Sequence, residues 1–198
     1  MVGTAPRRGR PGYDLDSLLA VAVQVFNERG YDGTSMEDLS ARLGISKSAI
    51  YHHVSGKEEL LRRSVDRALD ALFAVLDEPD ATEGRAIERL EHVVRRSCEV
   101  LVAELPFVTL LLRVRGNTGV ERAALARRRE FDSIVTDLVR QGEEEGDIRR
   151  DVDPALTARL LFGMVNSLTE WYRPDKGLSA HDLAESMAKI AFGGLRNV

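Results

Sequence analysis

Residues 34–57 read TSMEDLSARLGISKSAIYHHVSGK, and this stretch decides the fold of the N-terminal part of the chain. Two short helical patterns meet at Gly44, a residue that suits a tight turn between helices. The second pattern begins with the polar residues Ser46 and Lys47, and Tyr51 follows one turn later. This arrangement is typical of a helix-turn-helix, whose second helix enters the major groove of DNA.

The residue types in this stretch match the chemistry of DNA. Short polar side chains near the start of a recognition helix can approach base edges, and lysine, phenol and imidazole groups can donate to phosphate oxygens. The starts of the flanking helices also favour phosphate through their free N–H groups. Each residue could instead be only a cap or a surface group. The candidate DNA contacts are Thr34, Ser46, Lys47, Ser48, Tyr51, His52, His53 and Lys57.

Helical periodicity continues through the rest of the chain, and no stretch has the alternation of a strand. The pattern predicts a first helix ending at Gly30, and capping boxes at Thr34 with Glu37 and at Ser55 with Glu58. The fold class is therefore all-α. Later helices are expected near residues 82–104, 106–114, 120–145, 154–172 and 179–196.

Composition excludes several classes of protein. The 198 residues carry a formal net charge of −4 and are 43% hydrophobic, which provides enough apolar material for a core. The single cysteine, Cys98, permits no intramolecular disulfide. We find no secretory signal and no membrane span, so a cytoplasmic location is expected. Common catalytic and metal-binding motifs are missing from the sequence, and we expect neither an enzyme nor a cofactor or metal site.

The stretch FNERGYDGTSMEDLSARLGISKSAIYHHVSGKEELL, Phe26 to Leu61, resembles the TetR family of bacterial transcriptional regulators. Val54 departs from the family pattern, which more often has Phe there. The resemblance implies a homodimer that represses transcription from a palindromic operator and is released by a small effector. The family's DNA contacts, carried onto this chain, fall on Thr34, Lys47, Ser48, Tyr51, His52, His53 and Lys57.

Three segments follow from the patterns and the resemblance together. Residues 1–12 are rich in Gly, Pro and Arg and are expected to be a flexible basic arm, either a plain tail or a minor-groove contact. Residues 13–60 form the three-helix helix-turn-helix DNA-binding domain. Residues 61–198 form the helical effector-binding and dimerisation domain.

The last two helices of this family usually pair with their mates in a four-helix bundle. Small residues support close packing here, although packing within one protomer would also explain them. They are Ala155, Ala158, Gly163 and Ser167 on one helix, and Ala184, Ala188, Ala191 and Gly194 on the other.

The stretch EWYRPDKGLSAHDLAESMAKIAFGGL, residues 170–195, is similar to TetR regulators that respond to acyl-CoA thioesters. The resemblance implies an aromatic or medium-chain acyl-CoA of a catabolic pathway as the effector. The arginine run at residues 127–129 is either a solvated face or a receptor for the nucleotide end of CoA. The alternative is a multidrug-sensing repressor of an efflux pump, which ranks second because aromatic residues make up only 6% of the chain.

Candidate effector-binding residues combine apolar lining with polar groups inside apolar helices, because polar burial without a partner is costly. The apolar candidates could equally be plain core. The set is Phe107, Leu111, Arg113, Phe131, Arg159, Phe162, Met164, Asn166, Glu170 and Trp171.

Overall fold

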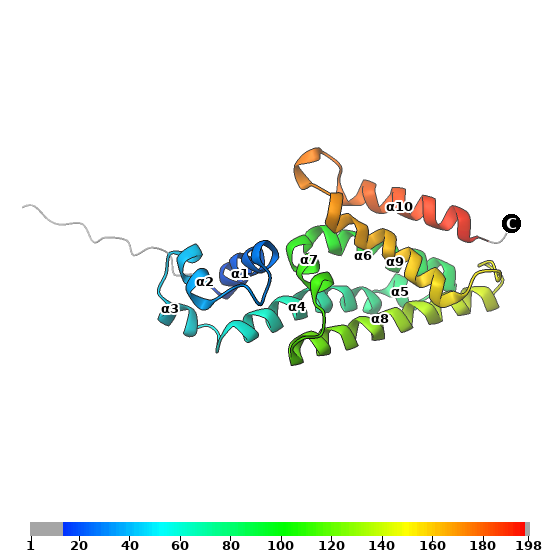
Figure 1. The fold of residues 1–198 in the computed structure, drawn as a ribbon. Coiled ribbons are helices and arrows are strands. Elements are labelled where there is room, and N and C mark those ends of the chain that lie inside the picture. Colours follow the sequence, from blue (N-terminus) through cyan, green and yellow to red (C-terminus); the bar gives the residue numbers. More distant parts are fainter. Residues whose placement is uncertain (1–13, 197–198) are drawn as a thin grey trace, which may run out of the picture. The chain divides into compact units, whose positions relative to one another are not determined.

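The structure, a computed structural model, describes residues 14–196 (Figure 1). The predicted basic arm, residues 1–12, lies outside the described residues. The chain forms helices and no strand between residues 14 and 196, which confirms the all-α fold class. The elements are α1 (Leu15–Arg29), α2 (Met36–Leu43), α3 (Lys47–Tyr51), α4 (Lys57–Ala74), the 3-10 helix η1 (Val75–Asp77), α5 (Pro79–Thr82), α6 (Ala86–Ala103), α7 (Leu105–Arg113), α8 (Gly119–Glu144), α9 (Pro154–Trp171), the 3-10 helix η2 (Pro174–Lys176) and α10 (Ala180–Leu195).

The chain divides into two compact units, of which the first ends at Leu60 and the second begins at Leu61. In the N-terminal unit α1 packs against α2, and α2 contacts α3. The helical period gathers the apolar side chains of each helix on one face. The buried side chains include Leu18, Leu19, Ala22, Phe26, Leu39, Leu43, Ile50 and Val54. This core fixes the three helices of the predicted helix-turn-helix.

The turn between α2 and α3 depends on Gly44. Its φ of 66° lies in the left-handed region, which glycine adopts without the steric cost of a Cβ. The Gly44 N–H donates to the Ser40 carbonyl oxygen at 2.9 Å and ends α2. The hydroxyl of Ser46 then accepts the Ala49 N–H at 3.2 Å and caps α3. The predicted turn at Gly44 is confirmed, and the second helical pattern begins after Ser46 as expected.

The capping box of α2 is shifted by one residue from the prediction. Ser35 is the N-cap, because its hydroxyl accepts the Asp38 N–H at 3.1 Å while the Asp38 carboxylate accepts the Ser35 N–H at 2.9 Å. The pairing of Thr34 with Glu37 was wrong. Both registers place an acid three residues after a hydroxyl, so the sequence motif alone does not separate them.

The start of α4 also differs from the predicted capping box. The helix begins at Lys57, and the Ser55 N–H donates to the carboxylate of Glu59 at 2.5 Å. The acid that reaches back to Ser55 is therefore Glu59, one residue beyond the predicted Glu58.

In the C-terminal unit α6 is the central helix, and α5, α7, α8, α9 and α10 all contact it. Cys98 on α6 is buried, and burial raises the pKa of its thiol to about 11, as expected for a core cysteine. A second core region surrounds Phe131 of α8, whose ring meets Phe73 and Phe162 edge to face at centroid distances of 5.7 and 5.2 Å.

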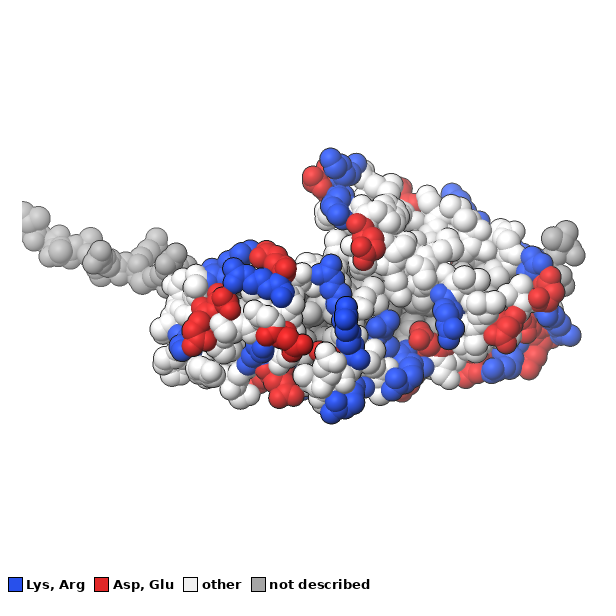
Figure 2. Space-filling view, viewed as in Figure 1, with Lys and Arg blue, Asp and Glu red and all other residues white. Residues whose placement is uncertain are grey.

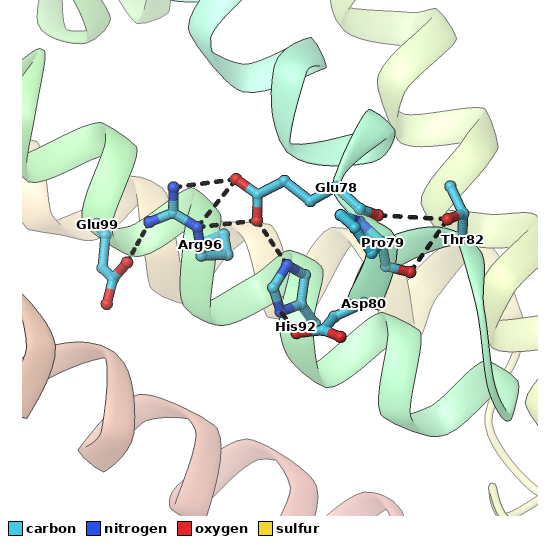
Figure 3. A network of polar contacts seen from close by, with 7 residues as sticks. All are labelled: Glu78, Pro79, Asp80, Thr82, His92, Arg96 and Glu99. Carbon is cyan, nitrogen blue, oxygen red and sulfur yellow. Dashed lines mark hydrogen bonds and ion pairs between the residues drawn. The ribbon is translucent and has the colours of Figure 1, made fainter.

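A polar network links the corner between η1 and α5 to α6 (Figure 3). The Nε of Arg96 donates to both oxygens of the Glu78 carboxylate at 3.0–3.1 Å, and Arg96 also pairs with Glu99. The Nε2 of His92 lies 2.6 Å from the same carboxylate. Hydrogen bonding from Arg96 holds the pKa of the Glu78 carboxyl below its usual range. Pro79 is the first residue of the short helix α5.

The C-terminal helices begin where the sequence predicts. Asp153 caps α9 by accepting the Leu156 N–H at 2.9 Å, with Pro154 as the first helical residue. Ser179 caps α10 by accepting the Asp182 N–H at 3.0 Å. No helix between residues 14 and 196 combines the length and apolarity needed to cross a membrane.

Candidate DNA interface and effector pocket

Six of the eight predicted DNA contacts are exposed on α3 or beside it. The side chain of Tyr51 is 52% exposed although it is aromatic, and aromatic side chains are more often buried. Ile50 points the other way and is fully buried, so the core fixes which face of α3 is presented. The exposed residues are Ser46, Lys47, Ser48, Tyr51, His52 and His53.

Lys47 forms an ion pair with Glu37 of α2. Both side chains are largely exposed, so water and salt screen the attraction. The hydrogen bond between them raises the pKa of Lys47 and lowers that of Glu37, which keeps both groups charged. The pair therefore holds a cation at the start of α3 while leaving it accessible to a stronger anion such as phosphate.

Thr34 and Lys57 are turned toward the N-terminal unit itself. Thr34 is 2% exposed, and its hydroxyl donates to the Gly30 carbonyl at 2.7 Å. The ammonium of Lys57 donates to the carbonyl oxygens of Tyr31 and Thr34 at 2.9 and 2.8 Å and lies 4.3 Å from the centre of the Tyr31 ring. The Thr34 hydroxyl is therefore not presented to solvent, and the assignment of Thr34 as a DNA contact stays a prediction. Lys57 serves first to fix the start of α4.

Charge on the N-terminal unit is mixed rather than one-sided. Figure 2 shows Lys and Arg side chains interspersed with Asp and Glu over its visible face. Like Lys47, two arginines of this unit are paired, Arg29 with Asp38 at 2.9 Å and Arg42 with Glu28 at 2.7 Å. Phosphate attraction therefore depends on local groups such as Lys47 rather than on net charge.

The C-terminal unit contains a pocket with about 550 Å³ of empty space, including its opening to solvent. Residues of α4, α6, α7, α8 and α9 line it, and most of the lining is apolar. The apolar wall includes Leu72, Val108, Leu111, Phe131, Phe162 and Val165.

Four polar side chains also line the pocket, and they differ in burial. Ser97 of α6 is 2% exposed. Arg128 and Asn166 are half-buried, and Asp132 is exposed. Partial desolvation of the Asp132 carboxyl raises its pKa, and the positive charges of Arg128 and Arg159 act in the opposite direction. The pocket thus runs from a charged, partly solvated region to a buried hydroxyl.

The predicted effector residues separate into two groups. Leu111, Phe131, Phe162 and Asn166 line the pocket. The other predicted residues do not line it: Phe107, Arg113, Arg159, Met164, Glu170 and Trp171. The Phe107 ring instead lies 4.3 Å from the guanidinium carbon of Arg67, and Trp171 is 52% exposed.

The arginine run of α8 is divided among different roles. Arg127 donates to Asp70 at 2.8 Å and lies 5.1 Å from the Phe73 ring. Arg128 lines the pocket, and Arg129 is exposed. Only one of the three arginines is therefore available to a ligand inside the pocket.

These features define a helix-turn-helix DNA-binding regulator with a separate pocket in its helical C-terminal unit. A model of the TetR family of bacterial regulatory proteins matches residues 18–63, and a tetracyclin repressor-like C-terminal domain model matches residues 83–195. Together the two models cover most of the sequence. The chain belongs to the TetR family, whose members are transcriptional regulators.

Three similar proteins have solved structures. SCO3833, a TetR-family member of Streptomyces coelicolor A3, is 64% identical with 91% of each chain covered and a TM-score of 0.85. The ketosteroid transcriptional regulator KstR2 of Mycobacterium tuberculosis is 26% identical, covering 94% of this chain and 98% of that one, with a TM-score of 0.84. AibR in complex with isovaleryl coenzyme A and operator DNA is 26% identical, covering 89% and 97%, with a TM-score of 0.74.

Proposed function

We propose that this protein is a transcriptional repressor that leaves its operator when an acyl-CoA thioester binds in the C-terminal unit. The observation that carries the proposal is the pocket, whose apolar wall ends in a partly solvated region with Arg128. An acyl-CoA has matching chemistry, because an apolar acyl chain is joined to a polar, phosphate-bearing end.

The similar proteins support the same ligand class. AibR has been crystallised with both isovaleryl coenzyme A and operator DNA. KstR2 of Mycobacterium tuberculosis, described as an HTH-type transcriptional repressor, is 28% identical over 186 residues, or 90% of each chain. Repression and a thioester effector are therefore the expectations that these relatives favour.

We assign the DNA contacts to the exposed residues of α3 and its C-terminal end. Ser46, Lys47 and Ser48 would approach base edges or phosphates, while Tyr51, His52 and His53 would donate to the backbone. Lys57 would act mainly by holding the start of α4 in place. The pairing of Lys47 with Glu37 would be exchanged for a phosphate contact on binding.

A homodimer would supply the second recognition helix. On α9 the exposed residues Leu156, Leu160, Gly163 and Ser167 follow one helical face, and Trp171 continues it. Ile190, 72% exposed on α10, adds to the exposed apolar surface, and Figure 2 shows a wide uncharged area over these helices. Such a patch is typical of a protein–protein interface. A dimer would let two copies of α3 read grooves about 34–36 Å apart.

Three of the small residues predicted at this interface lie elsewhere. Ala158, Ala184 and Ala188 are buried within the protomer itself, at 3%, 1% and 0% exposure. In the proposed dimer, the contact is therefore made by the exposed α9 face, with the large side chains of Leu156, Leu160 and Trp171, and not by these three alanines.

Helix α4 offers a route from effector to DNA. It starts in the N-terminal unit at Lys57 and contributes Ala68 and Leu72 to the pocket wall. A ligand that displaces this wall would alter the position of the start of α4. Such a ligand shifts the equilibrium only by its differential affinity for the DNA-binding and released states.

The test is fluorescence anisotropy of a labelled duplex from the region upstream of the protein's own gene. The protein is added with aromatic and medium-chain acyl-CoA thioesters, and in parallel with free CoA, the matching free acids and lipophilic cations. We expect tight binding that one thioester class reverses and that free CoA leaves intact. Release by lipophilic cations but by no thioester would overturn the proposal and favour a multidrug sensor.

A further inference from the structure

Ser97 is a buried hydroxyl without a hydrogen-bond partner between residues 14 and 196. It lies on the inward face of α6, and it lines the pocket. A buried polar group that loses water without gaining a partner destabilises the folded state. Such groups are rare in native proteins, and each requires an explanation.

Other helical hydroxyls of the same unit do find partners. The hydroxyls of Thr109, Thr136 and Ser186 each donate to the carbonyl four residues earlier, at 2.7–2.8 Å. This local bond is the ordinary solution for a hydroxyl within a helix. Ser97 does not form it, so its hydroxyl remains available to a group inside the pocket.

The burial of the lining residues orders the pocket from outside to inside. Arg128, Asn166 and Asp132 retain contact with solvent, whereas Ser97 is 2% exposed. The nucleotide part of CoA is too polar for a space lined mostly by apolar side chains, so the acyl part is what enters. The acyl chain of the effector is thus the part that meets Ser97.

We infer that the Ser97 hydroxyl hydrogen-bonds an oxygen substituent on the acyl chain, a ketone or hydroxyl beyond the thioester carbonyl. The effector is then an oxygenated acyl-CoA rather than a plain hydrocarbon one. This inference rests on the proposed function. The oxygen satisfies the buried hydroxyl, and a hydrocarbon chain of equal length leaves it unsatisfied, so discrimination comes from a single polar contact.

The experiment compares octanoyl-CoA with 3-oxo-, 5-oxo- and 7-oxo-octanoyl-CoA on the full chain. Affinity is measured by isothermal titration calorimetry, and release is measured on the labelled duplex. We expect one oxo position to bind roughly tenfold more tightly than octanoyl-CoA in the wild type. In Ser97→Ala this preference should be lost or reversed, because the ketone oxygen is then buried without a partner while the plain ligand loses nothing.

The thermal stability of ligand-free Ser97→Ala is a second measurement, and it should not fall when the affinity for the oxo-thioester falls. Removing an unsatisfied hydroxyl leaves the thermal midpoint of ligand-free Ser97→Ala unchanged or higher, even as oxo-thioester affinity falls. Ser133→Ala, the same change at an exposed site of α8 that does not line the pocket, should alter neither quantity. A lower midpoint together with unchanged discrimination would give Ser97 a purely structural role and overturn the inference.

The two proposals fail in different ways. If octanoyl-CoA and all its oxo forms bind the wild type equally and release the duplex, the acyl-CoA function holds and the role of Ser97 is refuted. If no thioester binds or releases the duplex, the proposed function fails and the inference fails with it. The comparison of ligands on the wild type needs no variant to fold.

Discussion

The α3 surface of the N-terminal unit and the pocket of the C-terminal unit differ in how they hold polar groups. On α3 the polar side chains face solvent, and Lys47 already has a partner in Glu37. In the pocket Ser97 is buried and has no hydrogen-bond partner among residues 14–196. A surface that binds a polyanion in water can exchange one partner for another at little cost. In the buried part of a pocket, a polar group without a protein partner gains a hydrogen bond only when a ligand supplies one. Such a group therefore selects ligands that carry a matching polar atom.

The largest expected effect comes from the C-terminal unit and is read out on DNA. Leu160→Glu places a charge in the exposed α9 face, and an unpaired charge buried in an interface costs about 3–5 kcal/mol. We expect a monomer by light scattering and a loss of operator affinity of at least about 100-fold. Leu178→Glu, at another exposed leucine before α10, is the matched control and should remain a dimer. If the Leu160→Glu protein stays dimeric, the assignment of the α9 face to the dimer interface is wrong.

The next prediction compares two lysines of the N-terminal unit, Lys57, which should contribute to stability, and Lys47, which should contribute to DNA binding. Lys57→Met removes two hydrogen bonds to carbonyl oxygens and a contact with the Tyr31 ring, and should lower the unfolding free energy by about 1–3 kcal/mol. Lys47→Met should leave stability unchanged, weaken DNA binding, and reduce the salt dependence of binding by about one phosphate. Chemical denaturation and anisotropy at several salt concentrations measure both. Equal stability of the two variants would contradict the assignment.

Outside the pocket, the Glu78 carboxylate has hydrogen-bond partners in Arg96 and His92, so it should stabilise the folded C-terminal unit. The pKa of Glu78 in the folded protein lies below its ordinary value, so its contribution to stability is present above that ordinary value and is lost as pH falls through the lowered one. Glu78→Gln should cost about 1–2 kcal/mol near neutral pH, and the difference should shrink in acid. Urea unfolding at a series of pH values measures it. A pH-independent difference would exclude the ionised pair as its source.

The smallest effect is expected at Glu37. Its carboxylate competes with phosphate for Lys47, so Glu37→Gln should tighten DNA binding, by roughly two- to fivefold at low salt. The gain should disappear in high salt because screening removes the competition. Anisotropy at two salt concentrations is sufficient. Weaker binding by Glu37→Gln would mean that the carboxylate positions Lys47 instead of restraining it.

The helix-turn-helix could be predicted closely because its determinants are local. Gly44 and Ser46 act within a few residues of their own positions, and the structure shows the turn at Gly44 and the start of α3 at Ser46. The errors were also local. Thr34 and Ser35 are neighbouring hydroxyls, each followed three residues later by an acid, and only the fold decides which one caps α2.

The pocket was harder to predict because helical periodicity shows which side chains of a helix face inward. It does not show which side chains of other helices they contact. Trp171 and Phe131 both have the apolar character of pocket lining, yet the first is exposed on α9 and the second is buried beside Phe162. Ser97 was missed, although it interrupts the inward stripe of α6 between Val94 and Leu101. A polar residue in such a stripe is a signal that the sequence does provide.

The central claim is that one chain couples operator binding to a ligand held elsewhere in the fold. The most direct test is the operator dissociation constant measured at rising concentrations of the effective thioester. We predict that it increases and then reaches a plateau, because an allosteric ligand changes affinity by a fixed factor. An increase without limit would mean direct competition at the DNA surface. A constant value across the whole titration would contradict the coupling itself.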